Sequence, residues 1–281
     1  MKILVINPNT TQAMTDDIGA MARKHAQPGT EITAVSPRYG PRSIEGHFED
    51  YLAAAAVTET VAENRDRYDA FIIACFGDPG VYACREITDR PVIGIAEAAL
   101  HMATFIGHKF SVVTVMPRAI PFMENLVRFI GLEGKCASVR APNLTVLMIE
   151  AEPDIAAREI IVQSRLAVAE DGAEVICLGC AGMGPLDQRV QDAVGVPVLD
   201  GTVCAVKMAE SLHDYGKRTS KVAAFAWAEP KELVGCSAVL EAVAKGAPNG
   251  RLTPTPGPSP SPRLRHGRGG GVAAGRGGGE A

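Results

Sequence analysis

Short runs of Val and Ile alternate with longer segments of helical periodicity along most of the chain. Six apolar runs predict strands, at Lys2–Ile6, Glu31–Val35, Ala70–Ala74, Phe110–Val115, Glu174–Leu178 and Lys221–Phe225. Continuous apolar runs are typical of strands that are covered on both faces. Five segments predict helices, at Thr11–His25, Glu49–Asn64, Ala119–Ile130, Pro153–Glu170 and Val203–Asp214. This alternation predicts an α/β fold with mainly parallel sheets.

The chain also repeats part of its own pattern after about 105 to 107 residues. The matched segments, in the same order in both halves, are KILVIN with KFSVVTV, DAFIIACFGDPG with EVICLGCAGMG, and PVIG with PVLD. The second match sets Cys75 on Cys180. We therefore predict two similar α/β lobes related by a pseudo-two-fold axis, with the active site in the cleft between them. The first lobe would hold residues 1–97 and about 208–246, and the second residues 98–207.

Composition indicates a globular body with a different last segment. Hydrophobic residues make up 47% and charged residues 21%, and no apolar run approaches the roughly 20 residues that cross a bilayer. The first residues lack signal-peptide features, so we expect a cytoplasmic protein with no membrane contact. Residues 247–281 contain 16 Pro and Gly and five Arg, and we expect a disordered, dispensable tail. The remaining chain has a net charge of −8, which gives no support for nucleic-acid binding.

Two of the seven cysteines end equivalent predicted strands. In parallel sheets, sites form beyond the carboxyl ends of the strands, so Cys75 and Cys180 would flank one cleft. A single cysteine at a strand end is more often an inert apolar residue. A matched pair favours acid–base chemistry, because racemisation needs a base on one face of a carbon and an acid on the other. The odd number of cysteines and the length of the chain favour free thiols over disulfides.

Each of these cysteines is followed by a turn of small residues. Pro79 and Pro185 suit the first turn of a helix, so backbone N–H groups there are expected to hold a thiolate and a substrate oxygen. Asp78 would either orient its turn or, as we prefer, cap the helix begun by Pro79. The residues expected at the substrate through these turns are Phe76, Gly77, Asp78, Ala181 and Gly182.

Four polar residues elsewhere are further candidates for substrate binding. Asn7 and Asn9 follow the first strand, where their amides would bind a substrate or cap the next helix, two roles that are compatible. Ser43 and Glu45 lie in a loop bounded by glycines, which would be a substrate lid or simply a solvated loop.

Metal and nucleotide chemistry find little support in the sequence. Cys177 and Cys180 form a CxxC, but no second CxxC or His pair accompanies it, and core packing explains Cys177. The six His are scattered without metal spacing, and no GxGxxG or P-loop follows a strand. We therefore expect neither a metal nor a cofactor.

Several motifs together resemble one branch of a known superfamily. They are INPNT at Ile6–Thr10, SIEG at Ser43–Gly46, ACFGDPG at Ala74–Gly80, LGCAGM at Leu178–Met183, RAIPFMENLVRFIG at Arg118–Gly131 and GVPVLDG at Gly195–Gly201. They are similar to the hydantoin racemase branch of the aspartate/glutamate/hydantoin racemase superfamily, which includes allantoin racemases. The likeness runs from about Lys2 to about Glu229. It implies two α/β lobes with the site between them, and Cys75 and Cys180 as the acid–base pair.

The two cysteine motifs differ from those of the amino-acid racemases in that superfamily. Those tend to carry Cys-Asn-Thr and Cys-Thr-His, whereas this chain has Cys-Phe-Gly-Asp and Cys-Ala-Gly-Met. The small, uncharged second turn favours a neutral ring, a 5-substituted hydantoin or allantoin, racemised at C5 without a cofactor by what we expect to be a homo-oligomer. The alternatives are an aspartate or glutamate racemase, a maleate cis–trans isomerase, a non-catalytic two-lobed ligand-binding module, or a thiol redox protein.

Overall fold

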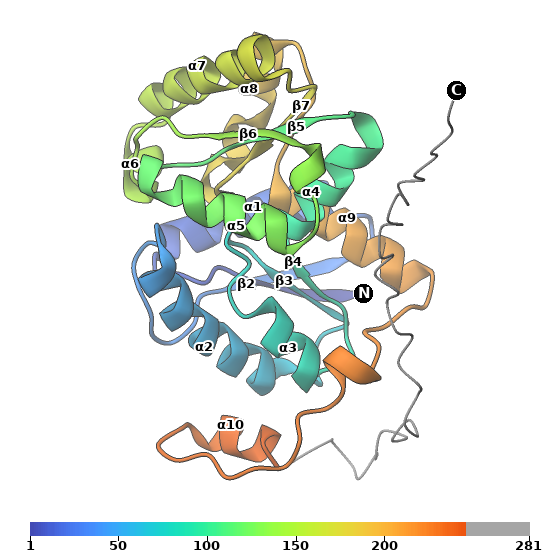
Figure 1. The fold of residues 1–281 in the computed structure, drawn as a ribbon. Coiled ribbons are helices and arrows are strands. Elements are labelled where there is room, and N and C mark those ends of the chain that lie inside the picture. The colour runs from blue at the N-terminus through green and yellow to red at the C-terminus, as the bar shows by residue number, and fades with distance from the viewer. Residues whose placement is uncertain (246–281) are drawn as a thin grey trace, which may run out of the picture.

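Two lobes, each built on a four-stranded parallel sheet, make up the computed structural model, which describes residues 1–245 (Figure 1). The predicted disordered tail, residues 247–281, lies outside the described residues. The first sheet has the order β2-β1-β3-β4, with strands Glu31–Val35, Lys2–Ile6, Ala70–Ile73 and Val92–Gly94. The second has the order β6-β5-β7-β8, with strands Cys136–Arg140, Phe110–Val113, Val175–Leu178 and Val198–Leu199.

Helices follow the strands in both lobes. In the first half they are α1 (Gln12–His25), α2 (His47–Asn64), α3 (Val81–Ile87) and α4 (Ile95–Ile106). In the second they are α5 (Ile120–Phe129), α6 (Val146–Ala151), α7 (Pro153–Asp171), α8 (Asp187–Val194), α9 (Gly201–Asp214) and α10 (Ala238–Val243). Short 3-10 helices are η1 (Pro117–Ala119), η2 (Glu133–Lys135), η3 (Ala181–Leu186) and η4 (Ala223–Phe225). None of the helices within residues 1–245 is long and apolar enough to cross a bilayer.

The two sheets have the same connectivity, which confirms the predicted α/β fold of two similar lobes. In each sheet the first strand of the half pairs in parallel with the second and the third, and the fourth extends the sheet beyond the third. The repeated PVIG and PVLD segments contain β4 and β8, which are too short for a periodicity to reveal them. The repeat matched these two segments, but we did not predict them as strands.

Strands β1 and β3 of the first sheet are buried on both faces, as their unbroken apolar runs predict, whereas the edge strand β2 is partly exposed. Ile3, Val5 and Ile72 point into the large core that continues into the second lobe, whereas Leu4 and Phe71 point into a smaller core under α2 and α3. Helix α9, from the second half of the chain, packs against α1 and α4 of the first half, so it joins the two halves. The lobe boundaries near residues 97 and 207 stay a prediction.

The predicted strand at Lys221–Phe225 is wrong. The segment is irregular and ends in the 3-10 helix η4, and Val222 is 56% exposed. The Lys221 ammonium donates to the carbonyls of Arg85 and Thr88, and the ring of Phe225 packs on Tyr82. These contacts fix the segment across the end of α3, where side chains rather than strand pairing satisfy it.

Candidate active site

A cavity lies between the lobes at the carboxyl ends of β1, β3, β5 and β7. Residues from both lobes line it, and they include both cysteines of the predicted pair. Cys75 follows β3 and Cys180 follows β7, as expected for a site beyond the ends of parallel strands. The lining comprises Asn9, Met14, Ile44, Glu45, Ala74, Cys75, Phe76, Gly77, Thr114, Val115, Ala119, Phe122, Met123, Val146, Gly179, Cys180 and Ala181.

The two thiols experience similar environments. Burial raises the pKa of Cys75 well above its usual range, and the carboxyl of Asp50 adds to the rise, while the backbone N–H of Gly77 acts in the opposite direction. Burial also raises the pKa of Cys180 to about 11, and the N–H of Gly182 opposes this rise. Both sulfurs are therefore thiols at neutral pH, and either one as a thiolate would be a strong base.

Gly77 is the tightest point of the first cysteine turn. A side-chain Cβ at this position would lie 2.6 Å from Asp50 Oδ1 and 2.8 Å from the ring of Phe122. Only glycine lets α2 and α5 approach the backbone beside Cys75 this closely.

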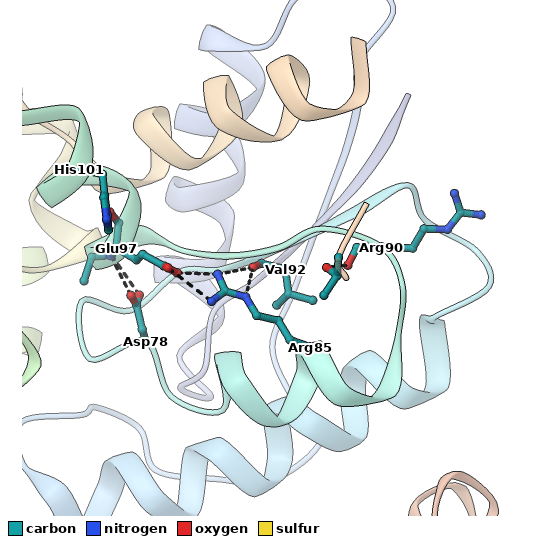
Figure 2. Close-up of polar contacts among 8 residues, drawn as sticks. Asp78, Arg85, Arg90, Val92, Glu97 and His101 are labelled. Atoms are coloured by element: carbon teal, nitrogen blue, oxygen red, sulfur yellow. Dashed lines mark hydrogen bonds and ion pairs between the residues drawn. The ribbon is translucent and has the colours of Figure 1, made fainter. Parts of the chain in front are cut away.

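Asp78 does not cap the helix that Pro79 was expected to begin, and that prediction is wrong. Helix α3 begins at Val81, and Asp78 instead accepts hydrogen bonds from the backbone N–H groups of Ala96 (3.0 Å) and Glu97 (2.8 Å) at the start of α4 (Figure 2). The carboxyl lies over Gly94, where a Cβ would collide with it. Asp78 thus ties the Cys75 turn to the next strand and helix and does not line the cavity.

The start of α4, to which Asp78 is bonded, is held in turn by an ion pair further from the cavity. Figure 2 shows the Glu97 carboxylate meeting the Arg85 guanidinium, which also donates to the Val92 carbonyl at 2.9 and 3.0 Å. Both charged side chains are largely buried, so their geometry is fixed. Asp78 is therefore held to a rigid layer made of α3, β4 and the first turn of α4.

The second cysteine turn also lies against a carboxyl, but no hydrogen bond joins the two. After Cys180 the chain forms η3, so Pro185 lies inside a 3-10 helix rather than in the first turn of an α-helix. Asp200 caps α9 by accepting from Val203 N at 2.8 Å, and its other oxygen lies beside Gly184. In the first lobe the carboxyl of Asp78 lies on the cysteine turn and Gly94 precedes helix α4. In the second lobe Gly184 lies on the turn and the carboxyl of Asp200 precedes helix α9.

Neither asparagine caps α1, whose N-cap Thr11 has no side-chain cap hydrogen bond, and the substrate-binding roles stay predictions. The Asn7 amide donates to Asn9 Oδ1 and to Thr15 Oγ1, both at 2.9 Å, so it is used within the protein. Asn9 lines the cavity, accepts from Thr11 N, and directs Nδ2 at the sulfur of Met14 (3.1 Å). Because a thioether is a weak acceptor, this Asn9 donor is the one available to a substrate.

Glu45 joins the two lobes across the cavity. Its Oε1 accepts from the backbone N–H of Val146, 101 residues away, at 2.9 Å, and both residues line the cavity. Neither Ser43 nor Gly182 belongs to the lining. The binding roles given to these residues stay predictions.

Sequence reasoning missed most of the cavity wall. Phe122 and Met123 lie in the Arg118–Gly131 motif, which gave them no role of their own, and Met14 was predicted only as part of the helix Thr11–His25. Thr114 is the repeat equivalent of Asn7, since KILVIN matches KFSVVTV, so the internal alignment contained the signal. Asp50, which contacts the Cys75 turn, has no such signal.

The wall is apolar except for a few groups. No Lys, Arg or His belongs to the lining within the described part of the chain, and no cluster of metal-binding side chains was found there. Its polar side chains are Asn9, Glu45 and Thr114, beside the two thiols. All seven cysteines are free thiols.

The fold and the cavity define a class of protein, a duplicated two-lobed α/β protein with one cysteine from each lobe at a shared interlobe site. The sequence profile described as Asp/Glu/Hydantoin racemase matches residues 3–209. A protein named hydantoin racemase from Pseudomonas sp. (strain NS671) is 44% identical over 236 residues, which cover 84% of this chain and 95% of that protein.

Solved structures agree with the sequence matches. Allantoin racemase from Klebsiella pneumoniae is 46% identical with a TM-score of 0.81, and covers 84% of this chain and 96% of its own. Allantoin racemase from Pseudomonas fluorescens is also 46% identical, with a TM-score of 0.82 and coverages of 84% and 100%. The chain belongs to the Asp/Glu/Hydantoin racemase family, and it is an enzyme of the isomerase class.

Proposed function

We propose that the chain racemises hydantoins that carry an apolar group at C5, by proton transfer between Cys75 and Cys180. The observation that supports this most is the lining of one interlobe cavity by both thiols, in a wall that is otherwise mainly apolar. The catalytic role of the thiols, the substrate, a cytoplasmic location and a homo-oligomeric state are all part of the proposal.

The proposed reaction needs only the two sulfurs and the substrate. The C5–H of a hydantoin is acidified by the adjacent carbonyl, so no cofactor is needed to stabilise the carbanion. One cysteine as thiolate takes the C5 proton and becomes a thiol, and an enolate forms. The other cysteine gives its proton to the opposite face of C5 and becomes a thiolate. The reverse reaction exchanges the two roles.

Neutral donors are the groups suited to the enolate and the ring. Backbone N–H groups of the two cysteine turns and the amide of Asn9 have no net charge, which matches a neutral substrate. An acidic amino acid or maleate would instead bring carboxylates into a cavity whose described lining has no cation. This disfavours aspartate, glutamate and maleate as substrates.

The C5 substituent would lie against the apolar wall formed by Ile44, Val115, Phe122, Met123 and Val146. Such a wall favours a hydrocarbon group, because burying apolar surface stabilises the complex by about 25 cal/mol per Å². Allantoin, which carries a polar ureido group, is the second candidate, favoured by the 46% identity to two allantoin racemase structures.

A substrate panel followed by polarimetry separates these possibilities. We expect racemisation of 5-benzylhydantoin, with a higher kcat/KM than for allantoin, and no racemisation of aspartate or glutamate. A higher kcat/KM for allantoin would assign the second candidate. Activity on an acidic amino acid alone, or on none of the panel, would contradict the proposal.

Truncating Phe122 to Ala removes the largest apolar side chain of the proposed substituent pocket. We expect kcat/KM for 5-benzylhydantoin to fall roughly tenfold or more, since lost apolar contacts in a pocket are worth about 1–3 kcal/mol. The loss for unsubstituted hydantoin, followed by solvent deuterium exchange at C5, should be smaller. Equal losses for both compounds would place the substituent elsewhere.

A further inference from the structure

Asp50 is a buried carboxyl without a partner. It lies in the first turn of α2 and is 6% exposed. Among residues 1–245 no donor reaches its Oδ1, which is completely buried. Buried polar atoms in proteins are almost always hydrogen-bonded, so an orphaned carboxyl oxygen calls for an explanation.

The place of Asp50 is beside the first cysteine turn. Its Oδ1 lies 2.6 Å from where a Cβ of Gly77 would be, and Gly77 is the residue whose N–H stabilises the Cys75 sulfur. A negative charge on Asp50 raises the pKa of Cys75, second only to the effect of burial. The Asp50 carboxyl and the Cys75 thiol therefore both lie next to the backbone of Gly77.

Few titratable or charged groups surround Asp50. Its own helix contributes His47 and Glu49, the segment before α5 contributes Arg118 beside Gly46, and the cysteine turn contributes Cys75. Within the described residues none of the cations forms an ion pair with Asp50. Burial raises the pKa of Asp50 to about 7, so its carboxyl loses its proton within the range in which an enzyme is assayed.

We propose that Asp50 is a positioning residue that controls the charge of Cys75. As a neutral acid it allows a thiolate to form on the sulfur, and as a carboxylate it opposes that thiolate. Both carboxyl forms remain in place, and only the proton on Asp50 changes. The inference deepens the proposed function, since it gives Asp50 a part in racemisation only if Cys75 is a proton carrier.

Alkylation tests the effect on the thiol without any substrate. Iodoacetamide labelling of the folded protein between pH 6 and pH 9, read by mass spectrometry, gives a separate rate constant for Cys75 and for Cys180, and each is proportional to the thiolate fraction. We expect Asp50→Asn, which keeps the shape and removes the charge, to raise the Cys75 rate constant about tenfold at pH 9 and to leave that of Cys180 in place. Asp50→Ser should change the Cys75 rate constant in the same direction.

The matched control is Glu49→Gln, which removes one negative charge from the neighbouring residue of the same helix turn. It should leave both rate constants unchanged, because Glu49 lies toward Gly46 and Arg118. An unchanged Cys75 rate constant at pH 9 in Asp50→Asn and Asp50→Ser, or an equal rise in Glu49→Gln, would overturn the proposal.

The pH dependence of catalysis gives the second readout. The ratio of kcat/KM for Asp50→Asn to that of the wild type should increase about tenfold between pH 6 and pH 9, because only the wild type acquires the opposing carboxylate. Ionisation of the substrate cancels in this ratio. A ratio that does not change with pH would contradict a role for Asp50 in racemisation. If the wild type racemises no hydantoin, the proposed function fails, while the alkylation result still decides whether Asp50 controls Cys75.

Discussion

Replacing either Cys75 or Cys180 by Ser is expected to lower the racemisation rate at least about a thousandfold. A hydroxyl is far less acidic than a thiol, so serine can neither form the base nor donate the proton at a useful rate. Because each enantiomer needs both groups, the two single variants should lose activity in both directions. Polarimetry with each enantiomer of 5-benzylhydantoin measures the loss.

The matched control is Cys136→Ser, since Cys136 is also half-buried but lies outside the cavity. Its variant should racemise at the wild-type rate. If either Cys75→Ser or Cys180→Ser kept a rate close to that of the wild type, the proton would have to travel by another route and the two-base proposal would fail.

Asp78→Ala is expected to lower the free energy of unfolding by about 2–3 kcal/mol and kcat by about a hundredfold. The variant leaves two buried N–H groups at the start of α4 without their acceptor, which is costly inside a protein. It also frees the turn that carries Cys75, and a displacement of about 1 Å at a reacting group can cost about a hundredfold in rate. Urea unfolding and polarimetry measure the two effects.

Asp78→Asn should give smaller losses of both kinds, because an amide retains one of the two acceptor oxygens. The control Asp154→Ala removes an exposed carboxylate whose ion pair with Arg189 lies on the surface, and its unfolding midpoint should not change. An Asp78→Ala variant with the stability and kcat of the wild type would mean that the link to α4 does not position the turn.

The architecture could be predicted from the sequence because its main strands are buried on both faces. Their apolar runs are continuous, and two of them end in a cysteine at equivalent points of a repeat, which is enough to bring Cys75 and Cys180 to one cavity. The same rule failed at Lys221–Phe225, because a short apolar run with one Val and two Ala also suits an irregular segment anchored by side chains such as Lys221.

The remaining site residues depend on contacts that no local pattern contains. Asp78 caps a helix that begins 17 residues later, so its partner could not be inferred from the adjacent Pro79. Asp50 lies in an alanine-rich helix with little amphipathic signal, and only the packing of α2 on Gly77 brings it to the thiol. Glu45 bonds to Val146 across the lobes, 101 residues away.

The most direct test of two sulfurs acting on opposite faces of one carbon is enantiomer-specific exchange of the C5 proton. Each enantiomer of 5-benzylhydantoin is incubated in D₂O with Cys75→Ser and with Cys180→Ser, and deuterium at C5 is measured by mass spectrometry above the uncatalysed background. The cysteine that remains should exchange the proton on its own side, so one variant labels one enantiomer, the other labels its mirror image, and neither inverts it. Labelling of the same enantiomer by both variants would contradict an arrangement of Cys75 and Cys180 on opposite sides of the substrate.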